Sequence, residues 1–264
     1  MNFLDFSNKT VLVTGAAGAI GKGVASGFAS LGAKVFITDI SEAALGAAEA
    51  EITGLGGVGC QSLPADVTQA DQVKQVVQKA AAFFDNRFDV LVNVAGIVAQ
   101  GKIEEISEAE WDRIFAVNCK GTFFFTRELV PYMKAQASGK IINYSSKSGK
   151  TGSALMSHYS AAKAAIIGFT QALAYELAEF NINVNCLCPG ITENTGVWSH
   201  VSAGYVQNLQ MPIDAVVKKF SAKVPLGRLA SIDDIVATTL FLASTGADYM
   251  TGQAINVTGG REMH

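Results

Sequence analysis

The sequence predicts an α/β protein, a single doubly wound Rossmann-type domain with a seven-stranded parallel sheet between helices. Short β-branched runs alternate with longer helical stretches along almost the whole chain. Most of the short runs are continuously apolar, as strands are when helices cover both faces of a parallel sheet. We find no repeat or linker, and 264 residues is a common size for one α/β domain.

The composition excludes several broad classes of protein. Apolar residues make up 49% of the chain and charged residues 16%, below the roughly 25% of an average globular protein. A disordered chain needs the opposite balance, and the net charge of −3 lacks the basic excess of a nucleic-acid binder. No run of 18 apolar residues occurs, so we expect no membrane segment.

The cysteines point to a reducing compartment. Cys60, Cys119, Cys186 and Cys188 include no pair with the Cys-x-x-Cys spacing of a zinc or redox motif. We therefore expect reduced thiols packed in the core, no metal site and a cytoplasmic protein.

The predicted elements follow one another in strand–helix order. Strands are expected at 10–14, 34–39, 58–63, 88–93, 140–145, 181–187 and 254–257. Helices are expected at 19–31, 42–53, 69–84, 108–135, 155–180 and 231–243. Residues 191–220 interrupt this order, and we expect a lid-like substrate insertion there. The helices at 108–135 and 155–180 are apolar on more than one side, so we expect further copies of the chain to cover them.

The first strand ends in a glycine-rich turn that opens the first helix, Thr14–Gly21. Glycines there let backbone N–H groups approach a pyrophosphate at the positive end of a helix. Asp39 ends the second strand 18 residues after Gly21, where its carboxylate can bind both ribose hydroxyls of NAD and repel the extra phosphate of NADP. Asp66, at the end of the third strand, can reach the adenine. Capping of the following helix is the alternative for both aspartates.

A second group of residues follows the fifth strand. Ser146 stands at its carboxyl end, where open α/β sheets bind ligands, and Tyr159 and Lys163 follow at a spacing of four. Residues four apart share one helical face, and an ammonium beside a phenol lowers the pKa of the phenol from ~10. This pair suits acid–base exchange between an alcohol and a ketone. The alternative is a packed tyrosine beside a surface lysine.

Together these motifs resemble the short-chain dehydrogenase/reductase family over nearly the whole chain. Thr14–Gly21 is similar to its Thr-Gly-x-x-x-Gly-x-Gly turn, and residues 93–96 (Asn-Val-Ala-Gly) are similar to its Asn-Asn-Ala-Gly segment. Ala19 and Val94 depart from these two patterns. The resemblance implies hydride transfer between a nicotinamide cofactor and a secondary carbon, and an enzyme that is usually a homotetramer.

The resemblance also implies a role for each matching residue. The catalytic tetrad would be Asn118, Ser146, Tyr159 and Lys163: Tyr159 moves the proton, Lys163 lowers its pKa and holds the ribose, Ser146 positions the substrate oxygen and Asn118 supports a water relay. The expected NAD site comprises Thr14, Gly15, Gly18, Ala19, Ile20, Gly21, Asp39, Ile40, Asp66, Val67, Asn93, Ala95, Gly96, Tyr159, Lys163, Pro189, Gly190 and Thr192. Thr195 is the alternative to Thr192 for contact with the carboxamide.

We expect a small-molecule substrate, and the sequence limits its chemical class only in part. Residues 143–153 and 251–260 resemble the sorbitol-6-phosphate 2-dehydrogenase branch, which favours a sugar alcohol or its phosphate. We expect substrate contacts from Ser146, Lys147, His158 and Trp198, with Ile97, Met156 and Tyr205 as further candidates. Lys147 and Lys150 could bind a phosphate, or could be solvated loop lysines or residues of a subunit contact. The alternatives are a reductase of 3-oxoacyl thioesters or small diketones, and a non-catalytic NAD-binding sensor.

Overall fold

A computed structural model describes residues 3–264, apart from the side chains of Tyr205 and residues 207–209. Seven strands form one sheet in the order β3-β2-β1-β4-β5-β6-β7, and every neighbouring pair is parallel. The strands are β1 Thr10–Thr14, β2 Lys34–Thr38, β3 Cys60–Ser62, β4 Val90–Asn93, β5 Gly139–Tyr144, β6 Ile182–Pro189 and β7 Ala254–Val257. The predicted fold class is therefore confirmed.

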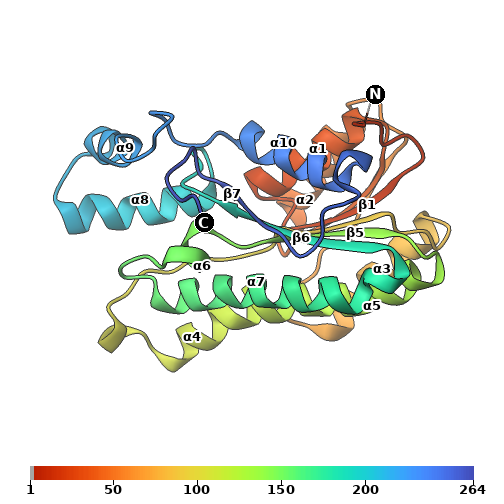
Figure 1. Cartoon of the computed structure of the whole chain (residues 1–264), viewed down its shortest axis with the longest axis horizontal. Coiled ribbons are helices and arrows are strands. Elements are labelled where there is room, and N and C mark those ends of the chain that lie inside the picture. Colours follow the sequence, from red (N-terminus) through yellow and green to blue (C-terminus); the bar gives the residue numbers. More distant parts are fainter. Residues whose placement is uncertain (1–2) are drawn as a thin grey trace.

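Helices cover both faces of the sheet (Figure 1). One layer holds α1 Ala19–Ser30, α2 Glu42–Thr53 and α10 Ile232–Ala243. The other holds α3 Ala70–Phe83, α4 Glu108–Phe115, α5 Thr122–Ala135 and α7 Ser157–Leu177. Short 3-10 helices span Ile103–Glu105, Ala178–Phe180 and Thr245–Ala247. Among the described residues, no helix is both long and apolar enough to cross a membrane.

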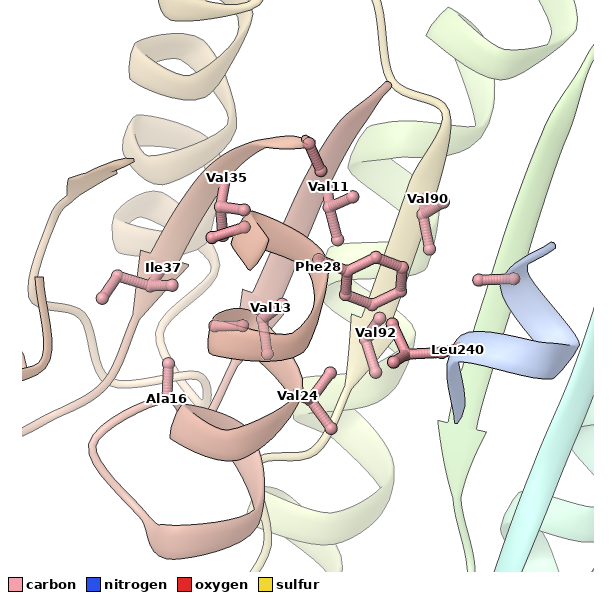
Figure 2. Close-up of a cluster of buried hydrophobic side chains, with 14 of the residues drawn as sticks. Val11, Val13, Ala16, Val24, Phe28, Val35, Ile37, Val90, Val92 and Leu240 are labelled. Atoms are coloured by element: carbon pink, nitrogen blue, oxygen red, sulfur yellow. The ribbon is translucent and has the colours of Figure 1, made fainter. Parts of the chain in front are cut away.

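The strands bury alternate side chains in two separate cores. Val11 and Val13 of β1 pack with Phe28 of α1 and Leu240 of α10 (Figure 2). Leu12, between them in sequence, faces the opposite core under α3, α5 and α7. Phe28 is fully buried, and its replacement by alanine would cost about 3–5 kcal/mol. This double burial explains why the strands are apolar without alternation.

The structure corrects several predicted boundaries. The expected helix 108–135 is divided by a π-helical turn, Ala116–Gly121. Strand β3 is shorter than expected, and α6 Lys147–Thr151 was not predicted. The insertion at 191–220 contains two helices, α8 Gly196–Leu209 and α9 Ile213–Ser221.

The sheet order places the site. The chain runs outward in one direction through β1, β2 and β3 and in the other through β4 to β7, so the order reverses between β1 and β4. Open α/β sheets bind ligands beyond the carboxyl ends of the strands at this reversal. Thr14 and Asn93, the last residues of β1 and β4, are paired there.

Candidate active site

A cavity of about 700 Å³ lies beyond the carboxyl ends of β1, β2, β3 and β4. From the predicted cofactor set it is lined by Gly15, Gly18, Ala19, Ile20, Gly21, Asp39, Ile40, Asp66, Val67, Ala95 and Gly96. Arg113 and His200 also line it, and the sequence did not point to either. Thr14 and Asn93 are buried behind this wall instead. Thr14 Oγ1 accepts from Ala95 N at 3.1 Å, and Asn93 Nδ2 donates to Asn143 Oδ1 at 2.9 Å.

The glycine turn brings backbone close to backbone. Gly15 has φ +68°, and a Cβ on it would lie 2.8 Å from Ala95 Cα. A Cβ on Gly21 would overlap the carbonyl oxygen of Gly15. Gly18 is the N-cap of α1, and in the described part of the chain no side chain accepts from the first N–H groups of this helix, those of Ala19, Ile20 and Gly21. The end of the turn therefore fits a pyrophosphate, because the N–H groups of the first helical turn and the helix dipole both favour an anion.

Asp39 holds this turn as well as lining the cavity. Its Oδ2 accepts from Ala17 N at 3.0 Å, and its Oδ1 accepts from Ser41 N at 3.3 Å. The carboxylate therefore combines the two roles considered for it, and it keeps acceptor capacity toward the cavity. Asp66 also lines the cavity, while its Oδ1 accepts from the backbone N–H of Thr68 at 2.9 Å.

A second cavity, of about 550 Å³, adjoins the first. Ile20, Val94, Gly96, Ile97, Thr195 and Val197 line both. Asn118, Ser146, Tyr159 and Lys163 all line the second cavity, although they come from the π-helical turn, the N-cap of α6 and the first turns of α7. Pro189, Gly190 and Thr192 lie in the same wall. The structure therefore brings the whole predicted tetrad to one place.

Burial dominates the acid–base properties of Tyr159. Its side chain is buried, and burial raises its pKa to about 12, although a hydrogen bond with Ser146 acts in the opposite direction. The expected lowering by Lys163 is not seen. Lys163 Nζ lies 5.8 Å from the centre of the Tyr159 ring and donates to the carbonyl oxygen of Tyr144 at 2.9 Å. Burial also lowers the pKa of Lys163 to about 8, so a smaller fraction of this lysine is charged and able to stabilise the phenolate of Tyr159.

The π-helical turn positions Asn118. Its Nδ2 donates to the carbonyl oxygens of Ile114 at 3.0 Å and Ile97 at 2.9 Å, while its buried Oδ1 has no partner among the described residues. A Cβ on Gly96 would lie 2.7 Å from that oxygen and 3.2 Å from Lys163 Nζ. A glycine is therefore needed at position 96, which lies against both the free acceptor of Asn118 and the ammonium of Lys163. Single π turns inside helices are frequent at functional sites.

Comparison with known proteins agrees with this geometry. The family model described as short chain dehydrogenase matches residues 9–205. The chain belongs to the short-chain dehydrogenase/reductase family. It is 38% identical to galactitol 2-dehydrogenase of Agrobacterium fabrum over 98% of this chain and 100% of that protein. It is also 38% identical to 3-oxoacyl-[acyl-carrier-protein] reductase FabG of Thermotoga maritima, over 97% and 99%.

Solved structures of the family share the fold. A crystal structure of a variant of actinorhodin polyketide ketoreductase with NADPH matches with a TM-score of 0.93 and 30% identity, over 97% of this chain and 98% of that one. The chain is therefore an oxidoreductase of alcohol or ketone groups that uses a nicotinamide cofactor.

Only some of the predicted substrate residues of this short-chain dehydrogenase line the second cavity. Ile97, Lys147, Met156 and Trp198 line the second cavity, whereas the side chain of Tyr205 is outside the described residues. The prediction for His158 was wrong. It is fully buried, with Nε2 3.0 Å from Glu110 Oε1, because neighbours on a helix point about 100° apart and Tyr159 takes the cavity side.

The loop lysines also differ from one another. Lys150 turns away and donates to the carbonyl oxygen of Ala254 at 2.7 Å, so the structure does not support a phosphate contact there. Lys147 remains in the wall, 3.6 Å from Glu262 Oε1. Phe220 and Arg261 complete the same wall, and sequence analysis missed both of them.

Proposed function

We propose that this enzyme is an NAD-dependent dehydrogenase of a sugar alcohol or sugar-alcohol phosphate, which interconverts a secondary alcohol and a ketone. The observation that carries the proposal is that Asn118, Ser146, Tyr159 and Lys163 all line the second cavity, which we call the substrate cavity. This cavity adjoins the first cavity, at the glycine turn. When bound, the nicotinamide cofactor supplies the hydride donor or acceptor.

Each of the four residues has a task that its surroundings support. Tyr159 exchanges a proton with the substrate oxygen, and Ser146 binds that oxygen through its hydroxyl. Lys163 is a buried cation close to the phenol, and it would hold the nicotinamide ribose. Asn118 offers its unpartnered Oδ1 to a water that returns protons from Lys163.

Residues of the chain would hold the cofactor along the first cavity. The glycine turn would bind the pyrophosphate, and Asp66 and Val67 would flank the adenine. Asp39 is the basis for preferring NAD to NADP. Its carboxylate already accepts from Ala17 N, so a phosphate beside it would displace this contact and add a like-charge repulsion.

Similarity and the size of the cavity both support the proposed substrate class. The chain is 38% identical to a galactitol 2-dehydrogenase, and the cavity of about 550 Å³ is of a size that holds small ligands. The second candidate is a reductase of 3-oxoacyl thioesters or small diketones. It is favoured by the equal identity to FabG and disfavoured by Asp39, because biosynthetic reductases usually use NADPH. A non-catalytic sensor would not need the tetrad.

A screen of NAD⁺ reduction decides among these candidates. Purified enzyme is offered polyols, polyol phosphates and hydroxy ketones with NAD⁺, and acetoacetyl thioesters and diacetyl with NADH and NADPH. Turnover of a polyol or its phosphate by NAD⁺, with a higher kcat/KM than for the thioesters, supports the proposal. Preference for a thioester with NADPH would support the second candidate, and cofactor binding without turnover would support a sensor.

We also propose that residues 191–220 cover the substrate and that the enzyme is a homotetramer. Thr192, Thr195 and Trp198 of this segment line the substrate cavity, which supports the first idea. An exposed apolar face on α7 supports the second.

A further inference from the structure

The substrate cavity carries two cations that the proposed proton transfer does not use. Lys147, Lys163 and Arg261 are the charged residues among its described lining, and no aspartate or glutamate in the described part of the chain reaches it. Lys163 belongs to the tetrad. Lys147 and Arg261 remain, so the cavity wall is positive where nothing in the reaction requires a charge.

The C-terminal turn holds Arg261 in this wall. Gly259 and Gly260 have φ values of +64° and +89°, and the turn packs on Val224 and Pro225 so closely that a Cβ on Gly260 would lie 3.1 Å from Pro225 Cγ. Figure 1 places the C-terminus beside α6, the helix that Lys147 begins.

The tail beyond this turn is anchored by hydrogen bonds. Thr258 Oγ1 donates to the carbonyl oxygen of Glu262 at 3.1 Å, and Asn256 Nδ2 donates to the same oxygen at 3.1 Å. The anchors fix the backbone on the far side of Arg261, so its side chain is presented from a rigid segment.

The carboxylate of Glu262 lies close to both Lys147 and Arg261. Glu262 Oε1 lies 3.6 Å from Lys147 Nζ and 3.4 Å from Arg261 Nε. Arg261 Nη1 is buried and has no hydrogen-bond partner among the described residues. Two positive charges and one negative charge leave a net positive charge, and the guanidinium has a donor still to satisfy. Burial lowers the pKa of Lys147, and Arg261 adds to this effect while Glu262 opposes it. An anion bound here would act in the same direction as Glu262 and offset the repulsion between the two cations.

The guanidinium of Arg261 also packs on the aromatic ring of Phe220. The guanidinium carbon of Arg261 lies 5.7 Å from the centre of the Phe220 ring, and Lys223 Nζ lies 5.7 Å from the same ring. A guanidinium held in this way presents a planar fork that matches the two oxygens of a phosphate or carboxylate.

We propose that Arg261, assisted by Lys147, is a specificity-determining residue that binds an oxyanion on the substrate, a phosphate or carboxylate away from the reacting carbon. The inference rests on the proposed function for the reacting alcohol and names the class of its substrate: anionic polyols rather than neutral ones. Glu262 is the counter-ion that keeps the two cations in place.

The test is a ratio of two specificity constants. We measure kcat/KM for sorbitol, sorbitol 6-phosphate and gluconate, and divide the value for each anionic substrate by the value for sorbitol. These two ratios are determined for the wild type and for Arg261→Gln, Lys147→Gln and Lys74→Gln. Lys74 is exposed on α3, so its variant is a control for the loss of one positive charge. A charge-assisted hydrogen bond contributes roughly 10- to 100-fold, so the wild type should favour at least one anionic substrate by this factor.

The variants should separate binding from chemistry. Arg261→Gln should remove most of the anion advantage, mainly through KM, Lys147→Gln should remove part of it, and Lys74→Gln should retain it. Arg261→Lys keeps the charge without the fork and should restore part of the advantage. The phosphate and carboxylate arms show which oxyanion is the natural one. A wild-type ratio near one in both arms, or a ratio in Arg261→Gln equal to that in Lys74→Gln, overturns the inference.

A binding measurement distinguishes failure of this inference from failure of the proposed function. Calorimetry with sorbitol 6-phosphate and gluconate reports the oxyanion subsite whether or not the enzyme turns them over. Binding that is at least 10-fold weaker in Arg261→Gln than in Lys74→Gln supports the subsite even if no polyol is oxidised. Equal binding by these two variants rejects it even if polyols are oxidised. Circular dichroism and thermal unfolding confirm that each variant is folded.

Discussion

Lys163 Nζ donates a hydrogen bond to the carbonyl oxygen of Tyr144 at 2.9 Å, from a side chain that is only 5% exposed. This contact ties α7 to the end of β5 and holds the ammonium in the wall of the second cavity, beside Gly96. Because the group is buried without a carboxylate partner among the described residues, its pKa falls to about 8. The site therefore keeps a cation that weakens the folded state.

The first prediction concerns this cost and its pH dependence. An unfolded lysine has a pKa of 10.5, so between pH 8 and 10.5 the unfolded chain binds a proton that the folded enzyme has released. Stability therefore rises with pH through this window. Relative to Lys163→Met, the free energy of unfolding of the wild-type apoenzyme should increase by about 2 kcal/mol between pH 7.5 and 10. Urea unfolding at both pH values measures it.

Lys74→Met is the control, because an exposed lysine on α3 should show no such change relative to wild type. A constant difference in stability between wild type and Lys163→Met across the window would contradict the lowered pKa.

The second prediction concerns the proton. Tyr159→Phe removes the phenol and leaves the ring in place, so kcat should fall by roughly 10²–10⁴-fold while NADH binding, followed by fluorescence, stays close to that of wild type. Tyr249→Phe removes a fully exposed hydroxyl and should retain activity. If Tyr159→Phe keeps more than about a tenth of the wild-type kcat, the proton takes another route.

The third prediction concerns cofactor choice. Asp39→Asn keeps an oxygen for Ala17 N and removes the negative charge, so the preference for NAD over NADP in kcat/KM should fall by roughly tenfold or more. Glu42→Gln removes the same charge three residues later, from the exposed first turn of α2, and should leave the preference unchanged. Equal use of both cofactors by the wild type would show that Asp39 does not select between them.

Much of the site could be predicted because the ends of parallel strands meet at one edge of the sheet. Asp39 and Ser146 follow buried apolar runs, and the spacing of Tyr159 and Lys163 places them on one helical face. Both patterns are local in the sequence, so they can be recognised without knowledge of the fold. The pKa of Tyr159 was predicted in the wrong direction because burial is set by residues distant in sequence.

Three features were hidden for the same reason. The π-helical turn at Ala116–Gly121 keeps the apolar spacing of an ordinary helix in the sequence. It also lies against a residue distant in sequence, because a Cβ on Gly121 would lie 2.6 Å from Val67 Cγ2. Arg261 reaches the cavity only because the chain turns back after β7. His158 was assigned to the substrate by its nearness to Tyr159 in sequence, whereas the direction of its side chain on α7 takes it to Glu110.

The last prediction concerns assembly through α7. The outer face of this helix exposes small apolar residues at helical spacing, with a tyrosine at one end that is 90% exposed; they are Ala164, Ala165, Gly168, Ala172 and Tyr175. Small side chains let a second helix approach closely, so this face suits contact with another copy of the chain. Sedimentation velocity at micromolar concentration should show a homotetramer. Ala165→Arg places a long cation in that contact and should shift the protein to smaller species, whereas Ala47→Arg makes the same change on exposed α2 and should not. A wild-type monomer, or a tetramer that Ala165→Arg leaves intact, would show that α7 is not the contact surface.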